Sequence, residues 1–306
     1  MTGVLLVNMG GARSSKEMKV FLSRMFNDPF ILPFGKPGRK LLAFIISNTR
    51  YKRSWEKYRS IGGTPIINAT VRTMEALQDK LPEEYKVRVA FSYTEPLISE
   101  SINAFSNEGI NDIIVIPLYP QSGYSTTRSV ENDIKEATKN RDLKIRFVKE
   151  FYQNKYYVEF WSKLIRKHIT EKGYSNPFLL FSAHSIPKYM VERGDTYPKG
   201  IEESARLIAN ALGLDFGHVY QSGMRRGEWI GPDIKGRLKE MAAEGKDEIV
   251  IAPISFVNEN LETLYDIDKE IVPFGENELG IKNISRVKIP DADDTFTELL
   301  KNIIKH

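Results

Sequence analysis

Apolar residues form short unbroken runs along the first half of this chain, and segments with a helical pattern separate them. The strand-like runs cover residues 4–10, 87–93, 112–120 and 144–150. The helical patterns between them cover residues 64–81, 99–108 and 128–139. Strands buried on both faces read as continuous apolar runs, so this alternation predicts a parallel sheet covered by helices on both sides.

The second half of the chain repeats this plan. Its strand-like runs cover residues 177–184, 218–223 and 247–257. In each half the third run follows a helix that ends in Glu-Gly, at Glu108-Gly109 and at Glu244-Gly245. The predicted fold class is therefore α/β, with two similar doubly wound, Rossmann-like domains and an active-site cleft between them.

We expect an N-terminal domain over residues 1–152 and a C-terminal domain over residues 153–291. A helical pattern over 158–170 opens the second domain. Residues 292–306 carry their apolar side chains on one helical face, which predicts a terminal helix that packs back on the first domain. Parallel sheets of this kind bind ligands at the carboxyl ends of their strands, so functional residues are expected there.

Composition narrows the function classes. Of the 306 residues, 41% are hydrophobic and 27% charged, which is typical of a globular protein. There is no cysteine, so disulfides, thiolate zinc sites and cysteine-ligated iron–sulfur clusters are excluded, and a reducing cytoplasm is the expected location. The first residues enter a strand with no basic segment before it, so no signal peptide is expected. The net charge of +4 does not indicate a nucleic-acid partner.

Positive charge is nevertheless concentrated in one place, the lip segment (residues 30–59). Residues 36–59 carry eight Lys and Arg side chains against a single acid, Glu56, and the apolar run 41–46 lies among them. This pattern suits a helix that lies on a membrane surface, giving a peripheral contact. An amphipathic helix that packs on its own domain is the alternative.

Two stretches at predicted strand ends carry titratable groups. His184 ends the buried run 177–184, and a histidine there can hold a metal ion or move a proton. Glu262, Asp266 and Glu270 are spaced four apart after the last buried run, so they share one helical stripe. A structural histidine and a solvated acidic face are the alternatives.

Three other motifs concern ligand binding, and the first of them argues against a nucleotide. The glycines after the first strand do not form a dinucleotide fingerprint, so a nucleotide site is poorly supported. Ser125 and Thr126 offer hydroxyls ahead of a helix expected to begin near Arg128, where a carboxylate or phosphate could bind. Trp229 lies in a loop, where an aromatic side chain lines an apolar pocket or packs on its own domain.

Several blocks of the chain, taken in order, resemble the ferrochelatase family, whose members insert ferrous iron into a porphyrin. They are LLVNMGG (5–11), KYRSIGGTPI (57–66), YPQ…STT (119–127), FSAHSIP (181–187), ERGDTYP (192–198), YQSG…WIGPD (220–233) and ISFVNENLETLYDID (254–268). The resemblance implies that His184 and Glu262 face each other across the porphyrin as catalytic and metal-contacting residues. Asp266 and Glu270 would extend a proton or metal path. The residues expected to contact the porphyrin are Met9, Tyr93, Ser125, Thr126, Gln221, Ser222, Trp229 and Phe256.

The chain departs from the family pattern at Asn260, where histidine is usual two residues before the glutamate. Met9 is the residue typical of members that act on protoporphyrin, whereas coproporphyrin-type members carry tyrosine. The resemblance implies a lyase of haem biosynthesis with Fe(II) and protoporphyrin IX as substrates and no permanently bound cofactor. The alternatives are a chelatase for coproporphyrin III or another tetrapyrrole, and a non-catalytic tetrapyrrole-binding protein. The patterns leave monomer and dimer open.

Overall fold

The computed structural model describes residues 1–223 and 227–306, and the chain divides into two compact units. The first unit comprises Met1–Glu150 and Asp291–His306, and the second comprises Phe151–Pro290. The chain therefore leaves the first unit once and returns to it for its last helix, α10 (Asp294–Lys305).

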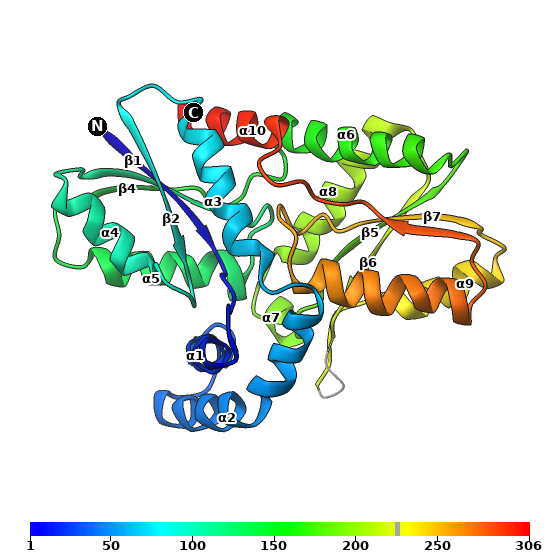
Figure 1. Ribbon diagram of the computed structural model, residues 1–306, viewed down its shortest axis with the longest axis horizontal. Coiled ribbons are helices and arrows are strands. Elements are labelled where there is room, and N and C mark those ends of the chain that lie inside the picture. Colours follow the sequence, from blue (N-terminus) through cyan, green and yellow to red (C-terminus); the bar gives the residue numbers. More distant parts are fainter. Residues whose placement is uncertain (224–226) are drawn as a thin grey trace. The chain divides into compact units, whose positions relative to one another are not determined.

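A four-stranded parallel sheet with the order β2-β1-β3-β4 forms the centre of the first unit. Its strands are β1 (Thr2–Asn8), β2 (Tyr85–Phe91), β3 (Asp112–Pro117) and β4 (Lys144–Phe147). On one face, Leu5 and Val7 pack against α4 (Ile98–Asn107) and α5 (Ser129–Thr138). On the other face Asn8 donates a hydrogen bond to Thr70 of α3 (Pro65–Gln78), so the helices cover both faces (Figure 1).

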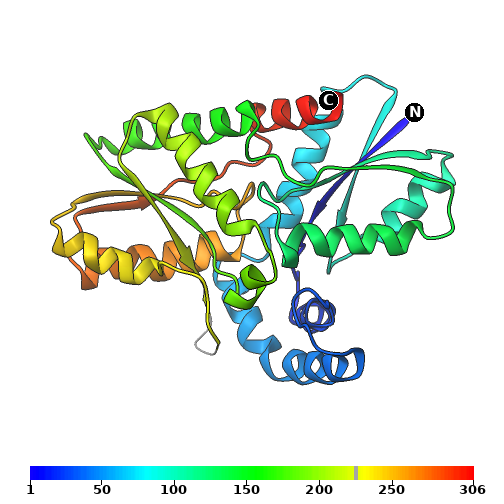
Figure 2. The same ribbon diagram turned by 180° about the vertical axis from the view of Figure 1, so that it is seen from behind.

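The second unit repeats this topology. Its parallel sheet has the order β6-β5-β7-β8, with β5 (Phe178–His184), β6 (Phe216–Gln221), β7 (Glu248–Ala252) and β8 (Asn283–Arg286). α6 (Lys155–Lys172) and α8 (Tyr197–Leu212) pack together in this unit (Figure 2). The sequence-based prediction of two similar α/β units built on parallel sheets is confirmed, although β8 was not expected.

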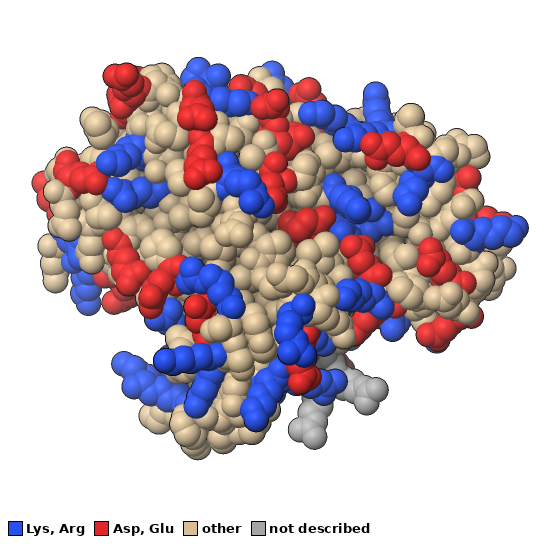
Figure 3. Space-filling model, in the orientation of Figure 1, with Lys and Arg blue, Asp and Glu red and all other residues tan. Residues whose placement is uncertain are grey.

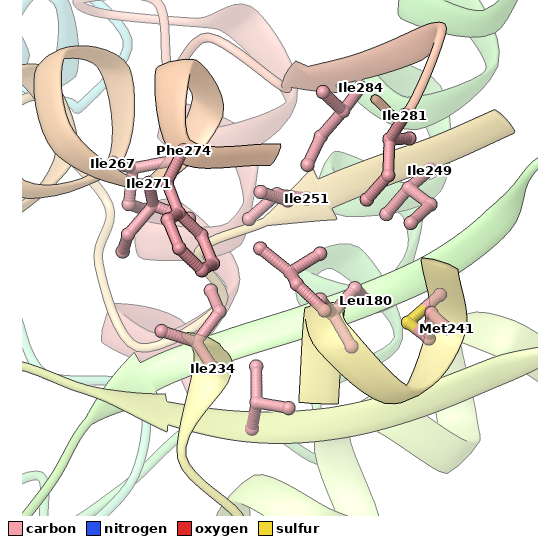
Figure 4. Packing of buried hydrophobic residues seen from close by; sticks show 12 residues of the cluster. Leu180, Ile234, Met241, Ile249, Ile251, Ile267, Ile271, Phe274, Ile281 and Ile284 are labelled. Carbon is pink, nitrogen blue, oxygen red and sulfur yellow. The ribbon is translucent and has the colours of Figure 1, made fainter. Parts of the chain in front are cut away.

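The opposite face of the second sheet carries the helices that matter for the site. α9 (Ile234–Ala243) and the π-helix η2 (Glu262–Ile271) bury their apolar side chains against Leu180 and Ile251 (Figure 4). A second π-helical turn, η3 (Phe274–Glu278), follows η2 directly. The acidic stripe was expected on an ordinary α-helix, so the wider winding of η2 is a correction. A spacing of four residues gives nearly one face in either winding, which is why the pattern did not distinguish them.

The lip segment belongs to an insertion between β1 and α3. α1 (Ser15–Phe26) packs beside α2 (Lys36–Ser60), which buries only Ala43 and Ser47. In the same orientation as Figure 1, Lys and Arg side chains gather over α2 (Figure 3). Within the two described ranges, no helix is long and apolar enough to cross a membrane.

Candidate active site

His184 is the last residue of β5, at the carboxyl edge of the second sheet, and its side chain is half-buried. Its Nδ1 atom lies 2.6 Å from the carbonyl oxygen of Ser185. A carbonyl oxygen can only accept, so Nδ1 carries the hydrogen and the neutral ring keeps its lone pair on Nε2. His184 is therefore held in the tautomer that can take a metal ion or a proton at Nε2.

Gln221 links His184 to the acidic π-helix. It ends β6, pairs with His184 in the strand ladder, and is fully buried. Its Nε2 donates to the backbone carbonyl of Glu262 over 3.3 Å. His184 and the backbone of Glu262, the first residue of the acidic stripe, thus lie at the same edge of the second sheet.

Ser222 follows Gln221 and makes a second bond to the same helix. Its backbone is in the left-handed region, with φ of 63°, an uncommon conformation for a residue other than glycine. Its hydroxyl donates to Oδ2 of Asp266 over 2.6 Å. Gln221 and Ser222 were expected to contact porphyrin; the structure shows both side chains bonded to the η2 helix.

The acidic stripe becomes more exposed along η2. Glu262 and Asp266 are half-buried, whereas Glu270 is exposed. The neighbouring stripe contains Ile267 and Ile271, which pack into the hydrophobic core and fix the rotation of the helix (Figure 4). The carboxylates consequently run from the strand edge to the surface.

Asn260 precedes this helix and is buried. Its side-chain Oδ1 accepts a hydrogen bond from the backbone amide of Thr263 over 3.0 Å. Its backbone amide donates to Oγ1 of Thr263 over 3.0 Å. This reciprocal pair has the form of a capping box, so Asn260 stabilises the start of η2. The residue that departs from the family pattern therefore has a structural role in this chain.

One further predicted residue, Trp229, lies near the residues that follow His184. Trp229 and Pro187 form an isolated antiparallel β-bridge, and the backbone amide of Ile230 donates to the carbonyl of Ile186. The 228–230 segment therefore lies beside the residues that follow His184. The Trp229 side chain is half-buried, and so is that of Phe256, which follows β7.

The predicted residues of the first unit lie beyond its strand ends. Met9 and Tyr93 share a hydrophobic cluster, and the Tyr93 hydroxyl donates to Oδ2 of Asp28 over 2.6 Å. Burial and the charge of Asp28 raise the pKa of Tyr93 well above its ordinary value. Ser125 and Thr126 are half-buried within the π-helical turn η1 (Tyr124–Arg128), which precedes α5, so they lie ahead of that helix as expected.

Sequence reasoning missed two buried charged residues, one in each unit. Asp28 is buried in the insertion between β1 and α3, just before the lip segment, and accepts hydrogen bonds from Tyr93 and Ser129. Arg286 is buried in β8. A signal for Arg286 was present, because a lone arginine between Ile284 and Val287 interrupts an apolar pattern, as a paired buried cation does.

Comparison with known proteins identifies the family. The ferrochelatase family model matches residues 1–306. A ferrochelatase of Aquifex aeolicus is 35% identical over 99% of this chain and 98% of its own length. A ferrochelatase of Sulfurimonas denitrificans is 33% identical, covering 98% of this chain and 97% of the relative. The chain belongs to the ferrochelatase family.

Membership in the ferrochelatase family makes this chain an enzyme of the lyase class that inserts a metal ion into a tetrapyrrole. The resemblance read from the sequence blocks is thereby confirmed. Since the chain contains no cysteine, it holds no iron–sulfur cluster.

Solved chelatases share the fold. SirB from Bacillus subtilis with Fe³⁺ has a TM-score of 0.58 at 14% identity, covering 98% of this chain and 94% of SirB. CbiX, described as the terminal enzyme of sirohaem biosynthesis in denitrifying bacteria, has a TM-score of 0.55 at 12% identity, covering 99% of this chain and 98% of CbiX. At these identities the likeness establishes the chelatase architecture alone.

Proposed function

We propose that this protein inserts Fe(II) into protoporphyrin IX to form protohaem, the last step of haem biosynthesis. The observation that carries the proposal is the junction at Gln221, which pairs with His184 and bonds the backbone of Glu262. It brings an imidazole with a free Nε2 lone pair to the same sheet edge as a carboxylate.

Metal insertion exchanges one divalent cation for two protons on the pyrrole nitrogens. We assign the first contact with iron to Nε2 of His184, because its tautomer leaves that lone pair available. We assign proton acceptance to Glu262, because Asp266 and the exposed Glu270 continue the stripe toward solvent. Each proton can then leave along carboxylates, without crossing the apolar core.

Protoporphyrin IX is favoured by Met9. Its side chain is half-buried against a cluster that includes Tyr93, and a polarizable thioether suits contact with a flat apolar ring. Anaerobic insertion of Fe(II) into protoporphyrin IX, coproporphyrin III and sirohydrochlorin tests this choice. Faster turnover of either more acidic tetrapyrrole would reassign the substrate.

A non-catalytic porphyrin-binding protein is the alternative that Asn260 raises, since asparagine cannot carry a proton as histidine does. The capping role of Asn260 gives this residue a structural function that does not depend on whether the protein is catalytic. If the wild-type protein and Asn260→His both bind porphyrin but insert no metal, the binding function is correct and the enzymatic one is not.

We further propose that this is a cytoplasmic protein whose lip segment touches anionic membrane surfaces. Its apolar side chains divide into two groups. Tyr51, Trp55 and Tyr58 pack inward on the Met18 cluster. The outward group is exposed: Phe34, Leu41, Phe44 and Ile45. Basic residues surround the outward group, so hydrophobic insertion and charge attraction act together.

A further inference from the structure

A buried ion-pair network connects β8 to the π-helix η2. The side chain of Arg286 is only 1% exposed. Its Nε and one terminal nitrogen each lie 2.7 Å from a carboxylate oxygen of Asp268, within η2. Its other terminal nitrogen lies 2.9 Å from Oε1 of Glu259, which precedes the helix. One guanidinium thus joins the body of η2 to the segment that leads into it.

Glu259 extends the network to Asn260 and Thr263, which precede and follow Glu262 in the sequence. Its Oε2 accepts a hydrogen bond from the hydroxyl of Thr263, and Thr263 is bonded reciprocally to Asn260. The residues at positions 260 and 263 are therefore both fixed, and Glu262 lies between them.

One guanidinium faces two carboxylates in this network. Burial opposes the charge on Arg286, but the hydrogen bonds and charges of Asp268 and Glu259 outweigh it and raise the pKa of the guanidinium. The planar guanidinium makes a two-point contact with Asp268 while still reaching Glu259. A lysine ammonium keeps the charge but lacks this fork, so it cannot reproduce the geometry.

We propose that Arg286 is a positioning residue that sets the place of Glu262 at the sheet edge, through Glu259 and Asp268. This inference rests on the proposed role of Glu262 in metal insertion. Gln221 and Ser222 hold η2 from β6, and Arg286 holds it from β8, so the helix is anchored by strands on both sides of β5 and β7.

The test compares Arg286→Lys and Asp268→Asn with a control, Arg237→Lys, whose ion pairs with Glu240 and Glu244 on α9 are solvent-exposed. Amide hydrogen exchange over residues 260–271 reports the anchoring directly. Zn²⁺ insertion into protoporphyrin IX gives kcat and KM, and porphyrin fluorescence quenching gives the binding constant.

We expect both variants to speed exchange in 260–271 while β5 and α6 stay protected. The kcat should fall on the order of 10–100-fold with porphyrin KM and binding nearly unchanged, because a small misplacement of a reacting group costs that much. The Arg237→Lys control should match wild type.

Unchanged exchange over 260–271, faster exchange throughout the second unit, or a raised KM with normal kcat would each overturn the inference. If wild type itself inserts no metal into any porphyrin, the proposed function fails. The exchange comparison then still decides whether Arg286 positions this segment.

Discussion

Asp133 lies in α5 near Asp28, and replacing it tests how burial and the charge of Asp28 affect its carboxyl group. Burial, and then the charge of Asp28, raise the pKa of Asp133 from its ordinary value of 3.8 to about 6. Asp28 also accepts a hydrogen bond from Tyr93 and one from the backbone amide of Phe30. Ionised Asp133 therefore destabilises the surroundings of Asp28. The Asp28 carboxylate connects Tyr93, a predicted porphyrin contact, to Phe30 at the start of the lip segment.

The sign and size of the effect follow from this pKa. Between pH 4 and 6 the folded state holds a proton on Asp133 that the unfolded state has released, so stability falls as pH rises through this window. The rise in pKa corresponds to about 3 kcal/mol, at about 1.4 kcal/mol per pKa unit. We expect Asp133→Asn to stabilise the protein at pH 7 by up to about 3 kcal/mol and to leave stability at pH 4 nearly unchanged.

Equilibrium urea unfolding of wild type and Asp133→Asn between pH 4 and 7.5 measures this difference directly. Asp142→Asn, at an exposed position beyond the same helix, is the matched control for removal of one negative charge. A gain that is equal at pH 4 and pH 7, or equal to that of the control, would show that burial and the charge of Asp28 do not destabilise ionised Asp133.

The remaining predictions concern the site and the lip segment. His184→Ala should fold normally but lose about 100-fold or more in metal insertion; normal turnover would remove His184 from the mechanism. Glu262→Gln should bind porphyrin yet insert almost no metal, and the opposite pattern, lost binding with intact chemistry, would make Glu262 a binding residue. Asn260→Ala should lower the unfolding free energy by about 1 kcal/mol through loss of the cap, measured by urea unfolding, and no change would show that the cap adds nothing. The protein should float with anionic liposomes at low salt and detach as salt rises, whereas Phe44→Asp should float poorly; wild type that stays at the bottom of the gradient would show that the lip segment only packs internally.

The fold was largely predictable because the inner strands of both sheets, β1, β3, β5 and β7, are buried on both faces. Runs such as residues 4–10 and 177–184 need no partner to be recognised, since burial alone demands continuous apolar residues. β8 was missed for the opposite reason. It is four residues long, and Ser285 and Arg286 are buried only because α6 and η2 supply their polar partners. Such partners are distant in the sequence and leave no local pattern.

The positions of the candidate site residues in the fold were easier to predict than their contacts. His184 ends β5 as the pattern predicted, whereas β7 ends at Ala252 and Glu262 is the first residue of η2. Which way Gln221 and Ser222 would point was not predictable, because both orientations suit a polar residue at a sheet edge. Ser222 has a left-handed backbone and bonds Asp266. This conformation depends on tertiary contacts, so no local sequence pattern predicts it.

The two units share one scaffold, yet they differ in chemistry at equivalent positions. Asn8 ends β1 and pairs with Phe91, just as His184 ends β5 and pairs with Gln221. The amide of Asn8 donates to Thr70 of α3, so that strand end presents a satisfied neutral group where the second unit presents a titratable ring. Parallel sheets create a binding edge in both units, but a reaction that moves protons requires ionisable groups at that edge. We therefore propose proton transfer at the strand end of the second unit, which carries His184, and apolar and membrane contacts for the first unit.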